Sequence, residues 1–191
     1  QHNQTNMEQN VIQKNMWNTA GKAGLFLGLT STAFLFISQL LGQVEIPVFL
    51  NSILSFILWT AKFIGCIWIM KFFMKKFTAE NEGTTSSNTF RLGMAMAILS
   101  ALVYSAFAFA NVAFISPDLY TEQMDAMMQQ MAPMMDSNTM SVMETYMENL
   151  AQITFFTNLI YCFLYGMVLS FILSRNIPSK DPFAEYKPAE Q

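Results

Sequence analysis

The residue that raises a chemical question is Lys62, which lies inside the apolar run ILWTAKFIGCIWIM at residues 57–70. If this run crosses a bilayer, Lys62 lies about 13 Å from Lys71 at the cytoplasmic edge, at a rise of about 1.5 Å per helical residue. An ionisable side chain at that depth costs about 2.5–3.5 kcal/mol on insertion scales, and by default it indicates a functional site.

Lys62 needs a partner, but the apolar blocks of the chain contain no Asp, Glu, His or Arg. Side chains with a hydroxyl group are expected at a comparable depth, and these are Thr32, Tyr104, Ser105, Tyr161 and Tyr165. The favoured interpretation is architectural: the lysine stem turns toward the cytoplasmic headgroups or its amine finds a local hydrogen bond. The alternative is a site for a substrate or an anionic lipid, built from Lys62, Tyr104, Tyr161 and Tyr165.

A second pattern with chemical potential is the methionine-rich segment 116–150. Thioethers suit Cu(I), and Met-x-x-Met spacing places two sulfurs on one helical face. The segment has no His or Cys, however, and each methionine lies where any apolar residue would complete an amphipathic helix. We therefore favour an interaction surface that packs on a partner or on the membrane, with Cu(I) as the alternative. Its residues are Met124, Met127, Met128, Met131, Met140, Met143 and Met147.

Catalytic groups are scarce. The two cysteines, Cys66 and Cys162, lie in apolar blocks, and the single histidine is His2. No zinc ligand set, disulfide framework or nucleophile–base pairing follows from this pattern. We expect a protein that is not an enzyme and that has no metal and no cofactor.

The composition favours a membrane protein. Of 191 residues, 53% are hydrophobic and 12% charged, whereas soluble domains carry about 25% charged residues. A net charge of −3 argues against a nucleic-acid partner, which would need a clustered basic face.

Four apolar blocks are long enough to span a bilayer, which takes about 20 residues of helix. They cover about 23–41, 46–70, 93–115 and 151–173. We predict an all-α membrane protein: four transmembrane helices in an antiparallel bundle, with a Met-rich amphipathic helical hairpin at 116–150 between the third and fourth. We expect three parts in the chain. Residues 1–22 are a cytoplasmic leader with an interfacial start, residues 23–174 are the transmembrane domain, and residues 175–191 are a cytoplasmic, extended tail. Residues 1–6 precede a plausible start at Met7 and receive no function.

Links between the blocks carry further signals. The polar segment 75–93, with Gly83 and a Thr/Ser run, is typical of a flexible link. In the outer segment Ser116 is a predicted helix N-cap, Pro117 suits a first helical turn, and the stretch from Asp136 to Asn138 offers a second cap.

Orientation follows from the basic residues, which are enriched in cytoplasmic loops. One side carries Lys14, Lys22, Lys71, Lys75, Lys76, Arg91, Arg175, Lys180 and Lys187, and the other side carries no Lys or Arg. We therefore expect a multi-pass protein of the inner membrane with both termini in the cytoplasm.

Small residues recur every four positions, which lets helices in lipid approach closely. The stripes are Gly24, Gly28 and Thr32; Ala61 and Gly65; Gly93, Ala97, Ala101 and Ser105; and Cys162, Gly166, Ser170 and Ser174. We favour packing within one chain over packing between two copies.

The chain also resembles the bacterial membrane proteins grouped as domain-of-unknown-function family 4199. The resemblance rests on GKAGLFLGL at the start of the first span, ENEG…FRLGMA before the third, PDLYTEQMDAMMQQM after it, and DPF in the tail. It implies an inner-membrane four-helix protein with no established activity, and it suggests a polyprenyl-linked glycosyltransferase as a partner.

Three functional hypotheses follow. The leading one is a non-enzymatic scaffold or accessory subunit that binds membrane proteins or a second copy of itself. The second is a small transporter or a protein that handles lipids or polyprenyl phosphate through Lys62. The third is a Cu(I)-binding membrane protein.

Overall fold

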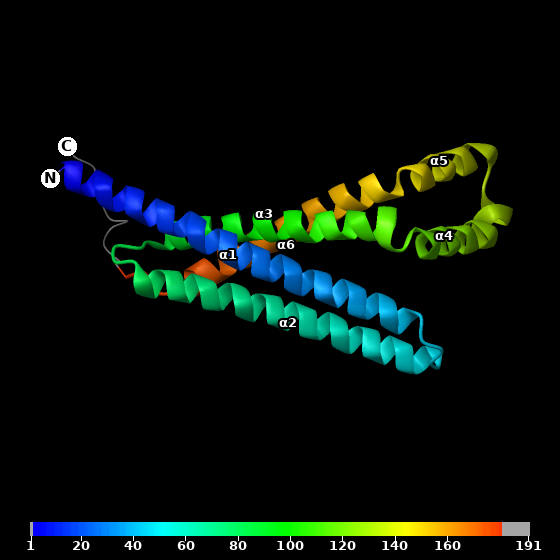
Figure 1. Cartoon of the computed structure of the whole chain (residues 1–191), viewed down its shortest axis with the longest axis horizontal. Coiled ribbons are helices and arrows are strands. Elements are labelled where there is room, and N and C mark those ends of the chain that lie inside the picture. Colours follow the sequence, from blue (N-terminus) through cyan, green and yellow to red (C-terminus); the bar gives the residue numbers. More distant parts are fainter. Residues whose placement is uncertain (1, 181–191) are drawn as a thin grey trace.

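The structure, a computed structural model, describes residues 2–180, and its side chains from residue 10 onward. The helices in chain order are α1 (His2–Gly42), α2 (Val48–Glu80), α3 (Ser86–Ala110), the π-helical turn η1 (Asn111–Ile115), α4 (Pro117–Met131), the 3-10 turn η2 (Ala132–Met134), α5 (Ser137–Glu148) and α6 (Leu150–Asn176). No strand occurs in this part of the chain. Four helices are long and apolar enough to cross a membrane, at Asn10–Gly42, Val48–Glu80, Ser86–Ile115 and Leu150–Asn176. The predicted all-helical protein with four membrane-length helices is confirmed (Figure 1).

The helices run beyond the apolar blocks from which they were predicted. α1 is continuous through residue 22, so the expected boundary between a leader and the first span is not a break in secondary structure. Residues 2–20 contain neither Gly nor Pro, and hence nothing interrupts the backbone hydrogen bonds. The predicted extended tail lies, from residue 181 onward, outside the described residues.

The segment predicted as a flexible link between the second and third spans is mostly helical. Only residues 81–85 separate α2 from α3, and Gly83 adopts a φ of 73° there. Two buried threonines, Thr78 and Thr89, lie 3.3 Å apart through their hydroxyl oxygens. The Thr85 hydroxyl accepts a hydrogen bond from the backbone N–H of Asn88, at 3.2 Å, and so caps α3. Because these polar groups satisfy one another, a sequence rich in Thr and Ser forms an ordered turn.

α3 is the central helix, and it packs along both α1 and α6. Small residues allow this: a Cβ added at Gly28 would lie 2.6 Å from the Cβ of Val103, and one added at Gly166 would lie 2.5 Å from the Cβ of Ala97. The stripes on α1, α3 and α6 therefore pack within the chain, as predicted. On α2, by contrast, nothing approaches Gly65 within 4 Å, and this stripe makes no close contact.

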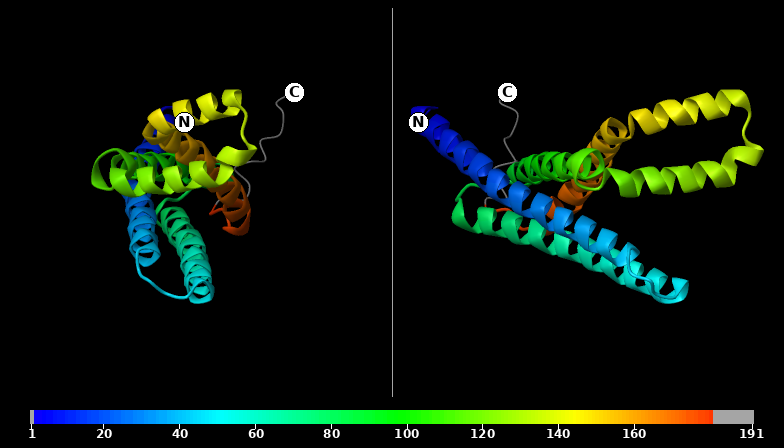
Figure 2. Two further views of the ribbon diagram at one scale, coloured as in Figure 1. Left: turned by 90° about the vertical axis from the view of Figure 1, so that its right-hand side faces the viewer. Right: turned by 45° about the vertical axis from the view of Figure 1, so that its right-hand side comes forward.

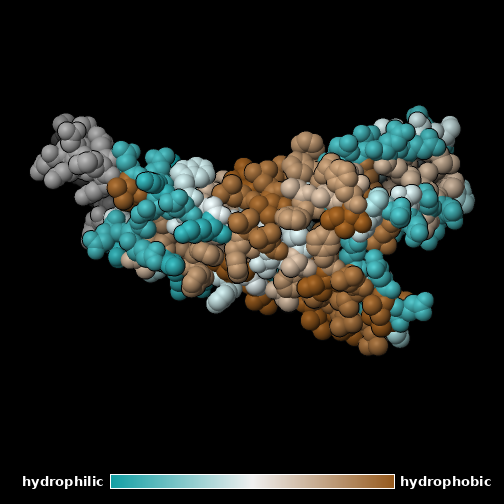
Figure 3. Space-filling view, in the orientation of Figure 1, coloured by the Kyte–Doolittle hydropathy of each residue, from teal (hydrophilic) through white to brown (hydrophobic). Residues whose placement is uncertain are grey.

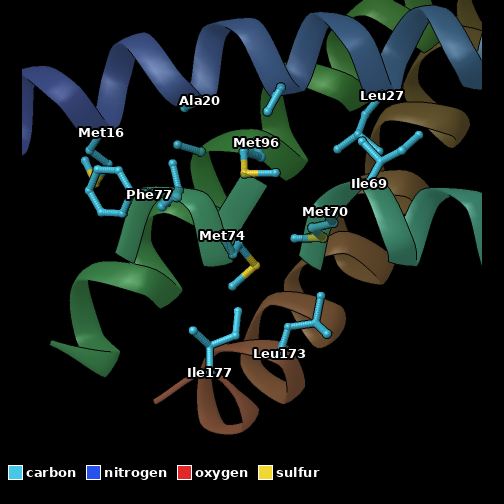
Figure 4. Packing of buried hydrophobic residues seen from close by; sticks show 13 residues of the cluster. Met16, Ala20, Leu27, Ile69, Met70, Met74, Phe77, Met96, Leu173 and Ile177 are labelled. Carbon is cyan, nitrogen blue, oxygen red and sulfur yellow. The ribbon is translucent and has the colours of Figure 1, made fainter. Parts of the chain in front are cut away.

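The buried core lies toward the end of the molecule where α1 begins and α6 ends. There the four long helices converge around Met74, Phe77 and Met96, which are at most 1% exposed (Figure 4). Toward the other end, α2 lies apart from α3 and α6 (Figure 2), while α1 stays hydrogen-bonded to η1 through Gln39 and Asn111. α2 and α6 make few contacts with each other. The core therefore closes one half of the bundle, and the other half is more open.

An apolar band covers the middle of the molecule, with hydrophilic surface at both ends (Figure 3). α2 contributes strongly to this band: Phe49 is 74% exposed, Phe56 66% and Trp68 66%. Contiguous apolar surface on this scale is expected where a helix faces lipid, and it identifies bilayer contact as the environment of α2.

The outer segment contains two predicted caps with different outcomes. The Asp136 carboxylate accepts a hydrogen bond from the N–H of Thr139 at 2.8 Å, which confirms it as the cap of α5. Ser116 precedes α4, but its side chain makes no capping bond. The Ser116 hydroxyl is instead occupied by the amide of Gln39, at 2.8 Å, a tertiary contact that sequence spacing could not predict.

Candidate functional site

A cavity of about 160 Å³ lies among the four membrane-length helices, and its lining residues come from α1, α2, α3 and α6. We call it the Lys62 cavity. Its lining residues are Leu27, Ser31, Trp59, Lys62, Phe63, Cys66, Met70, Ala97, Ser100, Tyr161, Cys162, Tyr165, Gly166 and Leu169. Lys62 is the single charged residue among them, and the rest of the wall is mainly apolar.

The Lys62 side chain reaches across the bundle to α3. Its Nζ lies over the Tyr104 ring, 4.5 Å from the ring centroid. The favoured expectation, a stem turned toward the cytoplasm or a local hydrogen bond for the amine, did not include this contact. A cation over the face of an aromatic ring gains about 0.5–2 kcal/mol.

No carboxylate neutralises Lys62. Among the residues whose side chains are described, the one ion pair joins Lys76 and Glu80 on the exposed face of α2. The cation–π contact recovers less than the roughly 2.5–3.5 kcal/mol that insertion of a lysine costs. Lys62 is thus held in place with its charge only partly compensated.

The predicted hydroxyl partners fall into two groups. Tyr161 and Tyr165 line the cavity with Lys62, while Tyr104 lies beneath the ammonium as a ring and not as a hydrogen-bond acceptor. The Tyr165 hydroxyl is buried and has no hydrogen-bond partner. Thr32 donates its hydroxyl to the Gly28 carbonyl, at 2.8 Å, and is not available to Lys62.

Ser105 does not line the Lys62 cavity, although it is fully buried on α3 with an unpartnered hydroxyl. The four residues predicted as a ligand or lipid site, Lys62, Tyr104, Tyr161 and Tyr165, are brought together by α2, α3 and α6.

Both cysteines of the chain lie on the cavity wall, Cys66 on α2 and Cys162 on α6. The sulfur of Cys66 lies 3.6 Å from the hydroxyl oxygen of Ser31 on α1. The sequence did not predict that the two cysteines share a cavity, because almost a hundred residues separate them in the chain.

Aromatic rings form one side of the cavity. Trp59 and Phe63 stack on α2 with centroids 5.5 Å apart, and Phe63 contacts Tyr165 on α6 at the same separation. These contacts bridge α2 and α6, which otherwise touch little. They give the cavity an aromatic wall to which the Tyr165 ring also belongs.

Comparison with known proteins places the chain in a family. The family model described as "Protein of unknown function (DUF4199)" matches residues 22–175. The chain belongs to this family. No curated protein and no solved structure matches it.

The DUF4199 match spans the region from Lys22 in α1 to Arg175 in α6, and it includes every residue of the Lys62 cavity. The cavity is therefore a feature of the family region of this chain and not of its ends.

A second polar cluster lies at the outer end of the spans, and sequence reasoning missed it. We call Gln39, Asn111, Ser116 and Tyr120 the outer polar cluster. Asn111 is fully buried in η1, and its Nδ2 donates to Gln39 Oε1 at 2.6 Å and to the Tyr120 hydroxyl at 3.0 Å. Burial raises the pKa of Tyr120, while the hydrogen bond from Asn111 opposes that rise. The available signal was a carboxamide inside an apolar span, which favours a helix–helix hydrogen bond.

The seven methionines predicted as an interaction surface of this DUF4199 protein lie on α4 and α5, where no residue is fully buried. Met124, Met128, Met140, Met143 and Met147 are half-buried, and Met127 and Met131 are exposed. Among the described residues no group of three or more His, Cys, Asp or Glu could hold a metal ion. Both interpretations of this surface, partner binding and Cu(I), stay predictions.

Proposed function

We propose that this DUF4199 protein is a non-enzymatic, multi-pass protein of the inner membrane that binds the anionic group of a membrane amphiphile in the Lys62 cavity. Both termini lie in the cytoplasm, as the distribution of Lys and Arg favours. The observation that carries the proposal is a lysine without a carboxylate partner, facing an apolar cavity inside a membrane span.

An anionic group supplies what Lys62 lacks. A carboxylate or phosphate oxygen within hydrogen-bond distance of the ammonium forms a charge-assisted bond, which is about twice as strong as a neutral one. The unpartnered Tyr165 hydroxyl on the same wall can donate a second hydrogen bond. The apolar wall of Trp59 and Phe63 accommodates the hydrocarbon part of the same molecule.

The absence of catalysis is part of the proposal. The apolar blocks 23–41, 46–70, 93–115 and 151–173 contain no Asp, Glu or His, and Glu80 at the end of the second span pairs with Lys76, so Lys62 has no acid–base partner at its depth. A single lysine beside tyrosines and thiols suits binding better than proton transfer. Among the earlier hypotheses, lipid handling through Lys62 is therefore the one that the geometry favours.

The test is an analysis of the lipids that co-purify with the protein. Wild type, Lys62→Met and Lys71→Met are extracted from native membranes in the same mild detergent, and bound lipids are identified by mass spectrometry. Methionine preserves the length of the side chain, and Lys71 is an exposed lysine on the same helix. We expect an anionic amphiphile that wild type and Lys71→Met retain and Lys62→Met loses. The same lipid profile in all three proteins would refute the proposal.

A second candidate function, the scaffold hypothesis, is favoured by the apolar side chains of α4, η2 and α5. Met134 is 89% exposed and Val142 69% exposed, and both lie outside the membrane-length helices. We propose that this surface binds a membrane protein or a second copy of the chain. Met134→Lys should release the co-purifying protein, whereas Gln130→Lys, at an exposed polar position of α4, should not. A wild-type protein that is monomeric and free of partners after gentle extraction would rule this function out.

A further inference from the structure

We infer that the ligand of the Lys62 cavity is a single-tailed amphiphile with one compact carboxylate, of the fatty-acid class, and that it reaches the cavity sideways from the bilayer between α2 and α6. The inference rests on the proposed function, and it specifies both the ligand class and the route. Four properties constrain the ligand independently: the charge on the cavity wall, the cavity volume, the side from which the cavity is reached, and the depth of Lys62 in the bilayer.

Charge limits the ligand to a single negative group. Lys62 is the one charged residue on the wall, and the other polar groups are neutral hydroxyls and thiols. A doubly charged phosphomonoester would leave one charge uncompensated in apolar surroundings, and this is strongly unfavourable. A monoanion and Lys62 together form a neutral pair.

The volume of the Lys62 cavity limits the size of the ligand's head group. At about 160 Å³, the cavity is close to the roughly 150 Å³ of an engineered apolar cavity that accepts benzene. It accommodates a carboxylate and its first few methylene groups. A glycerophosphate head with two acyl esters is much larger than this space, so diacyl phospholipids are excluded from it.

Access is lateral. Trp59 on α2 and Tyr161 on α6 both line the cavity, yet they are 58% and 66% exposed. A residue that faces both the cavity and the exterior marks its mouth, and here the exterior is the lipid-facing part of two spans. Since α2 and α6 touch little, a single acyl chain can lie between them while its head contacts Lys62.

Depth favours a carboxyl group over a phosphodiester. Lys62 lies about 13 Å along α2 from Lys71, well inside the hydrocarbon, at about 1.5 Å per residue. A ligand head must cross that distance through lipid. A carboxylic acid can do so in its neutral protonated form, whereas a phosphodiester stays charged throughout. Near Lys62 the ammonium then favours the carboxylate.

The test uses Cys66 and Cys162 as reporters, because they are the two cysteines of the chain and both line the cavity. The full chain is placed in phosphatidylcholine nanodiscs and treated with a small membrane-permeant methanethiosulfonate, and labelling is followed by intact mass. The probes are dodecanoate, dodecanol, dodecyltrimethylammonium, dodecyl phosphate and dioleoyl phosphatidylglycerol. Dodecanoate at ten times its Kd should slow labelling about tenfold, by occupancy.

The outcomes separate the inference from the proposed function. Both are supported if dodecanoate protects the thiols while dodecanol and the cationic probe do not, with protection lost in Lys62→Met and kept in Lys62→Arg and Lys71→Met. Equal or stronger Lys62-dependent protection by dodecyl phosphate or phosphatidylglycerol overturns the inference and leaves the proposed function standing. Both are refuted if dodecanol protects as well as dodecanoate, or if no anionic probe protects through Lys62. If Lys62→Met fails to fold, the comparison of the five probes on the wild-type protein decides between these outcomes.

Discussion

Gly166 is a point of very close approach between α6 and α3, and its replacement by alanine tests the packing of the bundle. An added Cβ would lie 2.5 Å from the Cβ of Ala97 and 3.3 Å from its Cα. Carbon atoms pack best at about 3.5–4.0 Å, so the two helices must separate by about 1 Å to admit the methyl group. The Ala97 methyl group has no alternative rotamer that would relieve the contact, and the shift falls on the backbone.

The cost can be worked out with a matched control. Overpacking of this kind costs about 1–3 kcal/mol, while replacing Gly by Ala in a helix gains about 1 kcal/mol from helix propensity. Gly65 on α2 has nothing within 4 Å of its added Cβ, so Gly65→Ala receives only the propensity gain. The difference between the two variants isolates the packing cost. It corresponds to a ratio of roughly 5- to 150-fold in the unfolding equilibrium.

The assay is unfolding by sodium dodecyl sulfate in mixed micelles, followed by far-ultraviolet circular dichroism. We expect Gly166→Ala to unfold at a lower dodecyl sulfate fraction than Gly65→Ala, and Gly65→Ala to match or exceed wild type. Equal stability of the two variants would refute the close contact between α3 and α6 on which the arrangement of the cavity depends.

Three further predictions concern the outer half of the molecule. Asn111→Ala should lower the unfolding free energy by about 1–3 kcal/mol, because the half-buried side chains of Gln39 and Tyr120 lose the hydrogen bonds that buried Asn111 donates to them. The control is Asn158→Ala, whose amide bonds only to Thr154 of its own helix, and an equal effect of the two would contradict a special role for Asn111. Hydrogen bonds from Thr139 hold the pKa of the exposed Asp136 below its usual value of 3.8. This cap therefore stabilises α5 fully above that value and is lost as the pH falls through the lower folded pKa. The protection of the Thr139 amide against exchange, relative to an unstructured amide at the same pH, should therefore fall in acid in wild type but not in Asp136→Asn. The orientation is tested with single cysteines in a chain whose own cysteines are replaced, Cys66→Ser and Cys162→Ser. Met134→Cys should react with an impermeant maleimide added outside intact spheroplasts, whereas Lys76→Cys should react only after lysis. The reverse pattern would overturn the proposed orientation.

Much of the fold could be predicted because the bilayer imposes simple rules on sequence. A helix that crosses hydrocarbon needs a long apolar run, so the four runs around residues 23–173 predicted four long helices. Helices in lipid approach closely where small residues lie at their interface. Gly24, Gly28, Gly93 and Gly166 therefore identified the helix faces that pack against one another. The exact ends of the helices were not predicted, because hydropathy marks the edge of the hydrocarbon and a helix continues through polar residues until something interrupts it.

The site was predicted only in part. Lys62 and the three tyrosines were recognised because a charge in an apolar run is conspicuous and hydroxyls at the same depth can be counted. The direction of the Lys62 side chain was not predicted, because it depends on the position of the Tyr104 ring on α3. Likewise the outer polar cluster joins Gln39 to Asn111 across more than seventy positions, and no local pattern encodes that pairing.

The sequence by itself determined that this is a four-span membrane protein with one lysine inside hydrocarbon, because the energy of burying a charge or an apolar run depends on composition alone. Tertiary structure decided that both cysteines and two tyrosines share one cavity with Lys62, and that α2 makes few contacts with α6. These features depend on the angles at which helices cross, and those angles result from side-chain contacts between segments that lie far apart in the chain.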